Sequence, residues 1–216
     1  MPHSHKHHPL SVPKHGSGIF ITGTDTGCGK TFVTILLARY LQKQGLDIGV
    51  MKPISTGKHS ENDALLLKRE LDLSDPIELI NPIKFKYPLA PYPAAKKERK
   101  KLKLRSIFKA FNELAKRHEL VLVEGIGGVA VPITANYVLI DLIRDMRLPA
   151  IIVARAGLGT INHTLLTINA LRQEKIEILG VIMNGFRGKD ISEKTNAEMI
   201  RKLGRVAILA KIPYLD

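Results

Sequence analysis

The sequence is poor in cysteine, since Cys28 is the only one among 216 residues. A single cysteine excludes an intramolecular disulfide and any zinc site built from several cysteines. The chain also lacks a run of about 18 uncharged apolar residues, which a helix needs to span a bilayer, and no secretory signal pattern opens it. We therefore expect a cytoplasmic protein with no membrane partner.

Acidic residues are scarce, with 20 Asp and Glu against 33 Lys and Arg, which gives a formal net charge of +13. A basic chain attracts nucleic acid or anionic membranes through its field. The excess of basic over acidic residues is local, however. Between Lys96 and Arg117 there are ten basic and two acidic residues, so eight of the thirteen net charges lie in this segment. We therefore interpret the excess as a property of one segment and expect no nucleic-acid partner.

Disorder is excluded for most of the chain because 44% of its residues are hydrophobic, too many for a chain that cannot form a core. Residues 1–17 differ: they hold five of the eight histidines, with proline, serine and glycine and no apolar periodicity. Closely spaced histidines can bind metal, but this composition favours a tag or a disordered extension. We expect a single domain over residues 18–216.

Short apolar runs alternate with segments of helical periodicity. The expected strands are 19–22, 47–52, 82–85 (a possible edge strand), 120–123, 149–154, 178–183 and 206–210, and the expected helices are 31–44, 62–71, 104–115, 137–147, 160–174 and 191–203. Strands that alternate with helices pair in parallel through right-handed crossovers. The sequence predicts a doubly wound α/β fold, a mostly parallel sheet with helices on both faces.

The segment GTDTGCGKT connects the first expected strand to the first expected helix. A phosphate-binding loop needs glycines that let backbone N–H groups surround phosphate oxygens, a lysine for the β- and γ-phosphates and a hydroxyl for Mg²⁺. Gly27, Gly29, Lys30 and Thr31 supply these groups. Five residues instead of the common four separate Gly23 from Gly29, so the match is to a variant loop. A chance Gly-Lys-Thr in a surface turn is the alternative, which the flanking strand and helix disfavour.

Cys28 within the loop has two interpretations. It is either a thiol made reactive by the helix N-terminus or a small apolar side chain packed beneath the loop, which we favour.

Two further groups follow the expected strands at their carboxyl ends, where ligands bind in parallel sheets. Lys52 ends one strand, and is either a solvated lysine or a second cation for an anionic ligand. Glu124 ends another strand and precedes several glycines. Together with Thr31 and Asp63, Glu124 would complete an oxygen-rich magnesium site.

The segments GTDTGCGKT, KPISTG, ENDA, VEGIGG, GLGTINH and IPYL, taken together, resemble the dethiobiotin synthetase family over nearly the whole chain. The resemblance implies a P-loop NTPase-like homodimer, with the substrate site at the dimer interface. It implies a ligase that closes a cyclic urea from 7,8-diaminopelargonic acid and carbon dioxide with ATP as co-substrate and Mg²⁺ as cofactor, releasing ADP and phosphate.

The resemblance also implies roles for individual residues. The catalytic set would be Lys52, Lys30 and Thr26, and the metal ligands Thr31, Asp63 and Glu124. Contacts to ATP would come from Gly27, Cys28, Gly29, Lys30, Thr31, Asp63, Glu124, Gly125, Ile126, Gly127, Asn184, Pro213, Tyr214 and Leu215. The substrate would contact Thr56, Gly159, Thr160, Ile161 and Asn162.

The strongest alternative is a partition-type ATPase that binds DNA through its basic segment. Such proteins carry a second lysine five positions before the loop lysine, where this chain has Asp25. A nucleic-acid-binding module without enzyme activity is weaker still, because Phe108 and Phe111 are expected on the apolar face of their helix and not free to stack on bases. The basic stretch 96–105 is not part of the synthetase pattern.

Overall fold

The computed structural model describes residues 17–57 and 63–214. Its centre is a six-stranded sheet in the order β10-β9-β8-β1-β5-β2, in which every neighbouring pair is parallel. The strands are β1 (Ser17–Gly23), β2 (Ile48–Met51), β5 (Leu120–Gly128), β8 (Ala150–Arg155), β9 (Ile178–Phe186) and β10 (Ile208–Pro213). Because the strands run in one direction, all their carboxyl ends meet at one edge. The expected fold class is confirmed.

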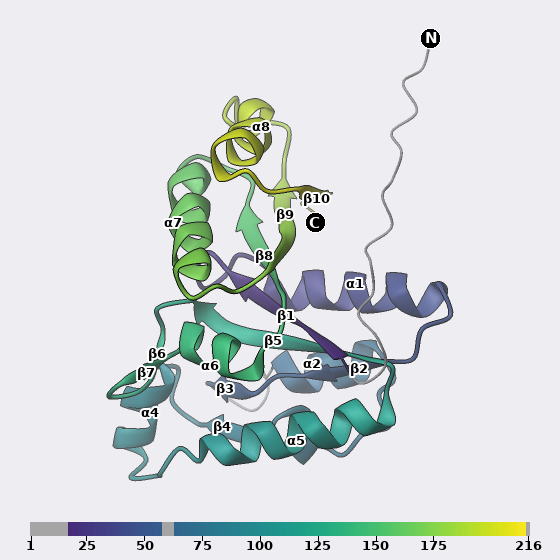
Figure 1. The fold of residues 1–216 in the computed structure, drawn as a ribbon, viewed down its shortest axis with the longest axis vertical. Coiled ribbons are helices and arrows are strands. Elements are labelled where there is room, and N and C mark those ends of the chain that lie inside the picture. The colour runs from purple at the N-terminus through teal and green to yellow at the C-terminus, as the bar shows by residue number, and fades with distance from the viewer. Residues whose placement is uncertain (1–16, 58–62, 215–216) are drawn as a thin grey trace.

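Helices cover both faces of this sheet (Figure 1). They are α1 (Lys30–Lys43), α2 (Asp63–Glu70), α3 (Ile77–Ile80), α4 (Pro91–Lys97), α5 (Leu104–Arg117), α6 (Leu139–Met146), α7 (Thr160–Gln173) and α8 (Glu193–Gly204). In Figure 1, α7 and α8 lie in the upper part of the molecule, and α4 and α5 lie at the bottom. No helix in the described parts of the chain is long and apolar enough to cross a membrane.

The alternation of side chains along β1 divides the core into two clusters. Phe20 points into a cluster that also holds buried residues of α5, α6, α7 and α8, whereas Ile19 and Ile21 point into a second cluster with α1 and α2. Successive side chains of a strand face opposite sides of the sheet. The continuous apolar run of β5, Leu120 to Val123, is fully buried for the same reason: both of its faces are covered.

Two small sheets depart from the expected elements. The predicted strand 82–85 is β4 (Ile83–Phe85), which pairs with β3 (Ile54–Thr56) and not with the central sheet. The predicted helix 137–147 was wrong at its start, because Tyr137–Val138 is strand β7, paired antiparallel with β6 (Pro132–Thr134). The Asp141 side chain accepts a hydrogen bond from the Val138 N–H and so begins α6 at Leu139.

The first strand of the sheet lies at the start of the described residues. Strand β1 begins at Ser17, one residue before the expected domain start, and residues 1–16 lie outside the described residues. The interpretation of the histidine-rich tail therefore stays a prediction. The basic stretch begins in α4, a helix that is not among those expected from the sequence.

His118 follows α5 and joins three segments. Its Nδ1 lies 2.9 Å from Asp47 Oδ1, and its Nε2 lies 2.8 Å from the buried Asp75 Oδ2. Burial alone would lower the pKa of His118, but the hydrogen bonds to Asp47 and Asp75 outweigh burial and raise it. The protonated imidazole therefore stabilises the folded chain.

We expect His118→Gln to lower the free energy of unfolding by about 1.5–3 kcal/mol at pH 6, the usual range for hydrogen bonds to charged groups. Because the folded pKa lies above the unfolded value of about 6.5, this stabilisation is fully present below that pH and is lost as the pH rises through the folded pKa. Urea unfolding of the wild type and of His118→Gln from pH 5 to 9 measures the difference between their free energies of unfolding. A difference that stays constant over this pH range would contradict the prediction.

Candidate active site

Four chain segments meet at the carboxyl edge of the central sheet. The loop after β1 carries Lys30 and Thr31 into the first turn of α1, and Lys52 follows β2. Glu124 lies in β5, and Asp63 begins α2. The sequence-predicted phosphate loop, second cation and carboxylates are thus brought together by the topology of the sheet.

The phosphate loop is held in shape by glycine geometry and by a contact from β9. Gly29 precedes α1 with φ +90°, a left-handed conformation that favours glycine. A Cβ atom at Gly29 would collide with the side-chain nitrogen of Asn184, which itself donates a hydrogen bond to the Cys28 carbonyl oxygen at 3.1 Å. Cys28 is buried in the cluster beneath α1. This position agrees with the interpretation of Cys28 as a packing residue.

Lys52 forms the centre of a buried ion-pair cluster. Its Nζ lies 2.6 Å from Glu124 Oε1 and 2.8 Å from Asp63 Oδ2, and it also donates to the Gly125 carbonyl oxygen at 3.2 Å. Lys52 is 2% exposed and Glu124 is fully buried. A charge is kept in such a place only when it is paired. The alternative of an ordinary solvated lysine is therefore wrong.

The pKa values of the two lysines of the site, Lys30 and Lys52, are shifted in opposite directions. Burial, with the nearby Lys52 ammonium, lowers the pKa of Lys30, whose Nζ donates to the Asp25 carbonyl oxygen at 3.0 Å. For Lys52, burial opposes the charge, but Glu124 and Asp63 outweigh it and raise its pKa. In Asp63, the effect of burial is outweighed by Lys52, which lowers the pKa of that carboxyl. Lys52 and Asp63 thus stay charged over the neutral range.

The groups expected to bind Mg²⁺ lie around one point. Thr31 Oγ1 donates to Glu124 Oε1 at 2.8 Å, and Asp63 reaches the same Lys52 ammonium as Glu124. Glu124 Oε2 is buried and has no hydrogen-bond partner among the described residues, an arrangement that leaves one carboxylate oxygen for a ligand. Over residues 17–57 and 63–214, no three His, Cys, Asp or Glu side chains form a metal cluster. A hydroxyl and two carboxylates nevertheless suit Mg²⁺, which keeps several waters.

Comparison with known proteins decides the family. A protein-family model described as an AAA domain matches residues 17–216. A protein of Bacillus velezensis (strain DSM 23117) is 45% identical over 91% of this chain and 86% of its own. A second, of Thermodesulfovibrio yellowstonii, is 43% identical over 92% of this chain and 89% of its own. Both are described as ATP-dependent dethiobiotin synthetase BioD. The chain belongs to the dethiobiotin synthetase family. It is therefore an enzyme.

Solved structures that resemble the chain agree with the fold. The 54 kDa signal recognition particle protein of Aeropyrum pernix has a TM-score of 0.54 at 16% identity, over 95% of this chain and 43% of its own. A ParA family ATPase of Chlorobium tepidum has a TM-score of 0.54 at 15% identity, over 93% of this chain and 85% of its own. At such identities the likeness concerns the fold alone, which is that of P-loop nucleotide-binding proteins.

The remaining residues that the dethiobiotin synthetase family implies lie at the rim of this edge. Thr56 ends β3, and the backbone from Gly159 to Asn162 forms the N-terminus of α7, with Asn162 exposed. Tyr214 follows β10; its N–H donates to the Phe186 carbonyl oxygen at 2.7 Å, and its ring lies under the Arg187 guanidinium. Asn184 contacts the phosphate loop, as described above. Leu215 lies outside the described residues.

Sequence reasoning missed Arg155, the last residue of β8. Its Nη2 donates to the Thr26 carbonyl oxygen at 2.6 Å, and the guanidinium lies 3.9 Å from Asp25 Oδ2. A peptide unit is planar and trans, so a held Thr26 carbonyl also fixes the direction of the Gly27 N–H, one of the expected phosphate donors. A basic residue at the carboxyl end of a buried strand was the signal that could have revealed it.

We expect Arg155→Ala to raise the KM for ATP about 3- to 10-fold, with a smaller change in kcat, because one charge-assisted hydrogen bond at a half-exposed position is lost. Arg155→Lys should recover part of the effect, since a lysine can also donate to the Thr26 carbonyl. Initial rates over a range of ATP concentrations measure both variants. An unchanged KM for ATP in Arg155→Ala would show that Arg155 does not contribute to ATP binding.

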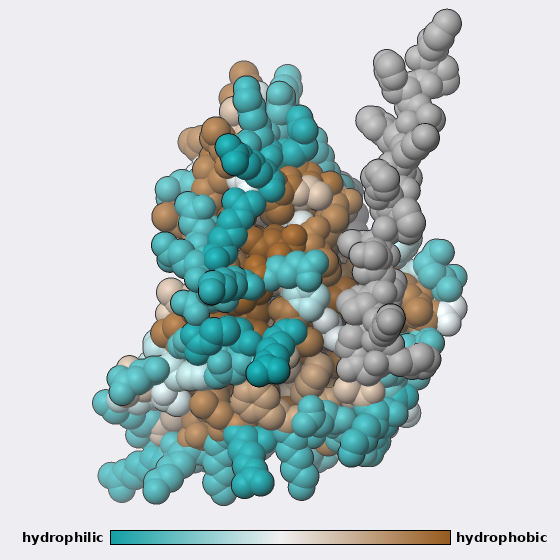
Figure 2. Space-filling view, in the orientation of Figure 1, coloured by the Kyte–Doolittle hydropathy of each residue, from teal (hydrophilic) through white to brown (hydrophobic). Residues whose placement is uncertain are grey.

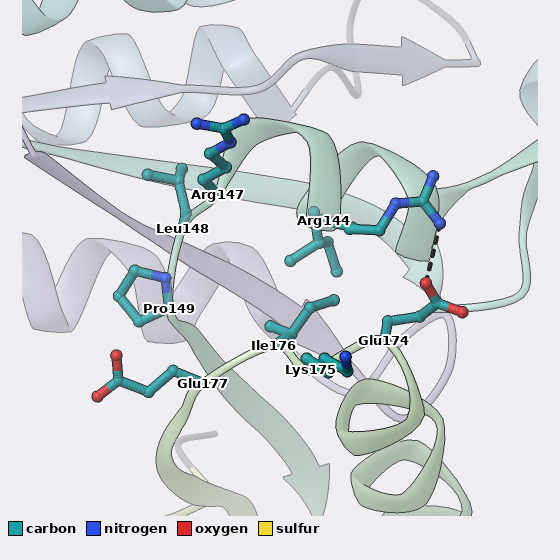
Figure 3. Close-up of a pocket in the computed structure, with 9 residues that line it drawn as sticks. Arg144, Arg147, Leu148, Pro149, Glu174, Lys175, Ile176 and Glu177 are labelled. Carbon is teal, nitrogen blue, oxygen red and sulfur yellow. Dashed lines mark hydrogen bonds and ion pairs between the residues drawn. The ribbon is translucent and has the colours of Figure 1, made fainter.

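The hollow shown in Figure 3 is not part of this site. It has a volume of about 270 Å³ and lies beside Pro149, before the amino end of β8 and hence at the opposite edge of the sheet. Its charged groups largely neutralise one another, as in the ion pair between Arg144 and Glu174 at 2.9 Å. The chemistry therefore belongs to the carboxyl edge.

Proposed function

We propose that the protein is an ATP- and Mg²⁺-dependent dethiobiotin synthetase. It forms the ureido ring of dethiobiotin from 7,8-diaminopelargonic acid and carbon dioxide, and releases ADP and phosphate. The observation that carries the proposal is the buried Lys52 ammonium, 2.6 Å from Glu124 and beside the phosphate loop. In the partition-type ATPase the second lysine stands five positions before the loop lysine, where this chain has Asp25, so a second cation that follows β2 favours the synthetase.

The reaction first brings two anions together. One uncharged amine of the substrate attacks carbon dioxide and loses a proton to solvent, which gives a carbamate. This anion must approach the negatively charged γ-phosphate. Lys30 and Lys52 offset the repulsion between these groups, and Thr26 together with the N–H groups from Gly27 to Thr31 positions the phosphates. Fixed charges and dipoles of this kind stabilise a transition state without reorganising.

Two displacements then complete the ring. A carbamate oxygen attacks the γ-phosphorus in line, the bond from this phosphorus to ADP breaks, and a mixed carbamic-phosphoric anhydride forms. The second amine attacks the carbonyl carbon, the bond from this carbon to the phosphate oxygen breaks, and the amine proton leaves to solvent. The protein contributes position and charge, and forms no covalent bond with the substrate.

Thr31, Asp63 and Glu124 are the residues that would hold Mg²⁺. The unpartnered oxygen of Glu124 supports this assignment. When bound, Mg²⁺ neutralises charge on the β- and γ-phosphate oxygens. Within the described residues, Lys52 is the cation that Asp63 and Glu124 share.

The active unit is a homodimer that pairs through α7. From Ala156 to Leu171 the chain has no Asp, Glu, Lys or Arg, although 25% of all residues are charged. Leu158 and Leu166 are 87% and 61% exposed, and hydrophobic atoms reach the surface in the upper left of Figure 2, where Figure 1 shows α7. Depletion of charge is typical of the core of an interface. A second copy there would bring its α7 N-terminus, with Asn162, to the substrate carboxylate.

We expect Leu166→Glu to convert the dimer to a monomer and to abolish dethiobiotin formation, because a charge placed in the interface core cannot be paired. Leu203→Glu is the matched control, since Leu203 is 59% exposed on α8 and outside this face. Light scattering during size-exclusion chromatography measures the mass of each variant. A dimeric Leu166→Glu protein would contradict the assigned interface.

Product analysis tests the function itself. The protein is incubated with ATP, Mg²⁺, bicarbonate and 7,8-diaminopelargonic acid, and dethiobiotin is sought by mass. We expect dethiobiotin and ADP in equal amounts. ATP hydrolysis that needs no diamine, is stimulated by DNA and yields no dethiobiotin would instead support the partition-type ATPase.

A further inference from the structure

The basic segment encloses a hollow that the proposed function does not use. This hollow, called the basic pocket below, has a volume of about 430 Å³, and its lining residues comprise four cations (Lys96, Arg99, Lys100 and Lys101) and five others (Tyr92, Ala95, Leu102, Ile133 and Thr134). Figure 2 shows hydrophilic residues along the bottom of the molecule, where Figure 1 places α4 and α5. The size is that of a small-molecule site.

The turn that carries these cations has a defined backbone. Helix α4 is followed by Glu98 and then by Arg99, which adopts the left-handed conformation at φ 52°. The Arg99 N–H donates to the Lys96 carbonyl oxygen at 3.1 Å, and the Lys100 N–H donates to the Ala95 carbonyl oxygen at 3.0 Å. These two bonds form a Schellman motif. The four cations are therefore presented by an ordered turn around an apolar floor.

The positive charge of the basic pocket is only partly neutralised by the residues that the structure describes. Glu98 is the one acidic residue between Lys96 and Lys101. It pairs with Lys100 at 2.6 Å and also accepts a hydrogen bond from the Lys86 N–H. No ion pair joins Lys96, Arg99 or Lys101 to an acidic residue in the part of the chain that the structure describes. Three cations thus face one hollow without a counter-charge.

The same segment does not form a continuous basic stripe. Along α5, Lys116 and Arg117 both pair with Glu113, and Arg117 also pairs with the buried Asp75. The adjoining groove contains Glu78 and Glu113 beside its basic residues. A nucleic-acid surface follows the phosphate backbone with cations over many ångströms. The acidic residues beside α5 interrupt such a row of cations, so the cations that line the hollow favour a small ligand instead.

We propose that the basic pocket binds a small anion that carries several phosphate groups. Lys96, Arg99 and Lys101 contact the phosphates, with Thr134 as a further hydrogen-bond donor. The Tyr92 ring, over which the Lys96 ammonium lies at 4.7 Å, and Ile133 contact the uncharged part of the ligand. This proposal is independent of the proposed function, because none of these residues belongs to the synthetase site.

Inorganic tripolyphosphate is the probe. In a titration followed by calorimetry, we expect the wild-type protein to bind it at the basic pocket in addition to the phosphate loop. The pocket variant combines Lys96→Gln, Arg99→Asn and Lys101→Gln, where asparagine suits the left-handed position. The control variant combines Lys43→Gln, Arg201→Gln and Lys202→Gln. These three exposed cations lie in the last turns of α1 and α8, so the control loses the same charge.

The pocket variant should bind tripolyphosphate at this site at least tenfold more weakly, while the control changes less than twofold. Both variants should unfold cooperatively and still form dethiobiotin at wild-type rates, which shows that they are folded. An equal loss of affinity in both variants would show that tripolyphosphate binding depends only on the net charge of the protein. This result would overturn the proposal.

Lysine acylation followed by mass spectrometry locates the binding site of the ligand. Tripolyphosphate should protect Lys96, Lys100 and Lys101, and should leave Lys109 and Lys116 of α5 reactive. No protection at the three pocket lysines would overturn the proposal. So would a single-stranded oligonucleotide that binds more tightly and extends the protection along α5, because the surface would then be a nucleic-acid site.

Discussion

Replacement of Lys52 by alanine is expected to lower the rate of dethiobiotin formation by about two to four orders of magnitude, by analogy with the loss of one preorganised charge-stabilising group. The Lys52 ammonium is buried and paired with both Glu124 and Asp63, so neither solvent nor a neighbouring side chain can replace it. Single-turnover assays with saturating ATP and diamine measure the chemical step. A turnover close to that of the wild type would remove Lys52 from the mechanism.

Loss of stability could imitate this effect, because Lys52→Ala leaves Glu124 buried without its counter-charge, at a cost of about 3–5 kcal/mol. The double variant Lys52→Met, Glu124→Gln, compared with Glu124→Gln alone, separates the two causes. It replaces the Lys52–Glu124 pair with uncharged groups of similar size, so we expect the free energy of unfolding to recover by more than half while the rate stays well below that of Glu124→Gln. Recovery of stability together with a rate equal to that of Glu124→Gln would assign Lys52 a structural role only.

Lys30→Ala should lower turnover by about two to three orders of magnitude and weaken ATP binding, because the ammonium expected at the β- and γ-phosphates is lost. The Lys30 ammonium donates to the Asp25 carbonyl oxygen, a backbone contact, and forms no ion pair among the described residues. We therefore expect a smaller loss of stability than in Lys52→Ala. Fluorescent ADP titration and steady-state rates measure the variant.

Lys43→Ala is the matched control, since Lys43 is an exposed lysine at the other end of α1. It should keep the wild-type ATP affinity and rate. Equal effects of Lys30→Ala and Lys43→Ala would mean that only the overall charge of α1 matters, and this would contradict the assigned phosphate contact.

Much of the site could be predicted because its residues follow elements with strong local signals. The apolar run before Glu124 marks a buried strand and the glycines of the phosphate loop mark a turn, although β5 continues past Glu124 to Gly128. A parallel sheet brings the carboxyl halves of such strands to one edge. This rule also placed Lys52 beside the loop. The pairing of Lys52 with both Asp63 and Glu124 could not be predicted, since it depends on where α2 packs.

Other features depend on contacts between distant residues. The collision that keeps Gly29 a glycine comes from Asn184, 155 positions further along the chain, and no local pattern reports it. Strands β6 and β7 have three and two residues, which is too short for any alternation of polar and apolar residues to be evident. Arg155 escaped notice because it ends β8 just before the segment GLGTINH and belongs to none of the segments on which the resemblance rests.

The two clusters of the core bear on how this chain can change during evolution. The phosphate loop and α1 pack on one face of the sheet, while α4 and α5, with the basic pocket, pack on the other. Substitutions in the outer layer of α4 and α5 can therefore accumulate without repacking the helix that carries Lys30. One fold can thus keep the phosphate loop constant on one face of its sheet while the surface of the helices on the other face changes.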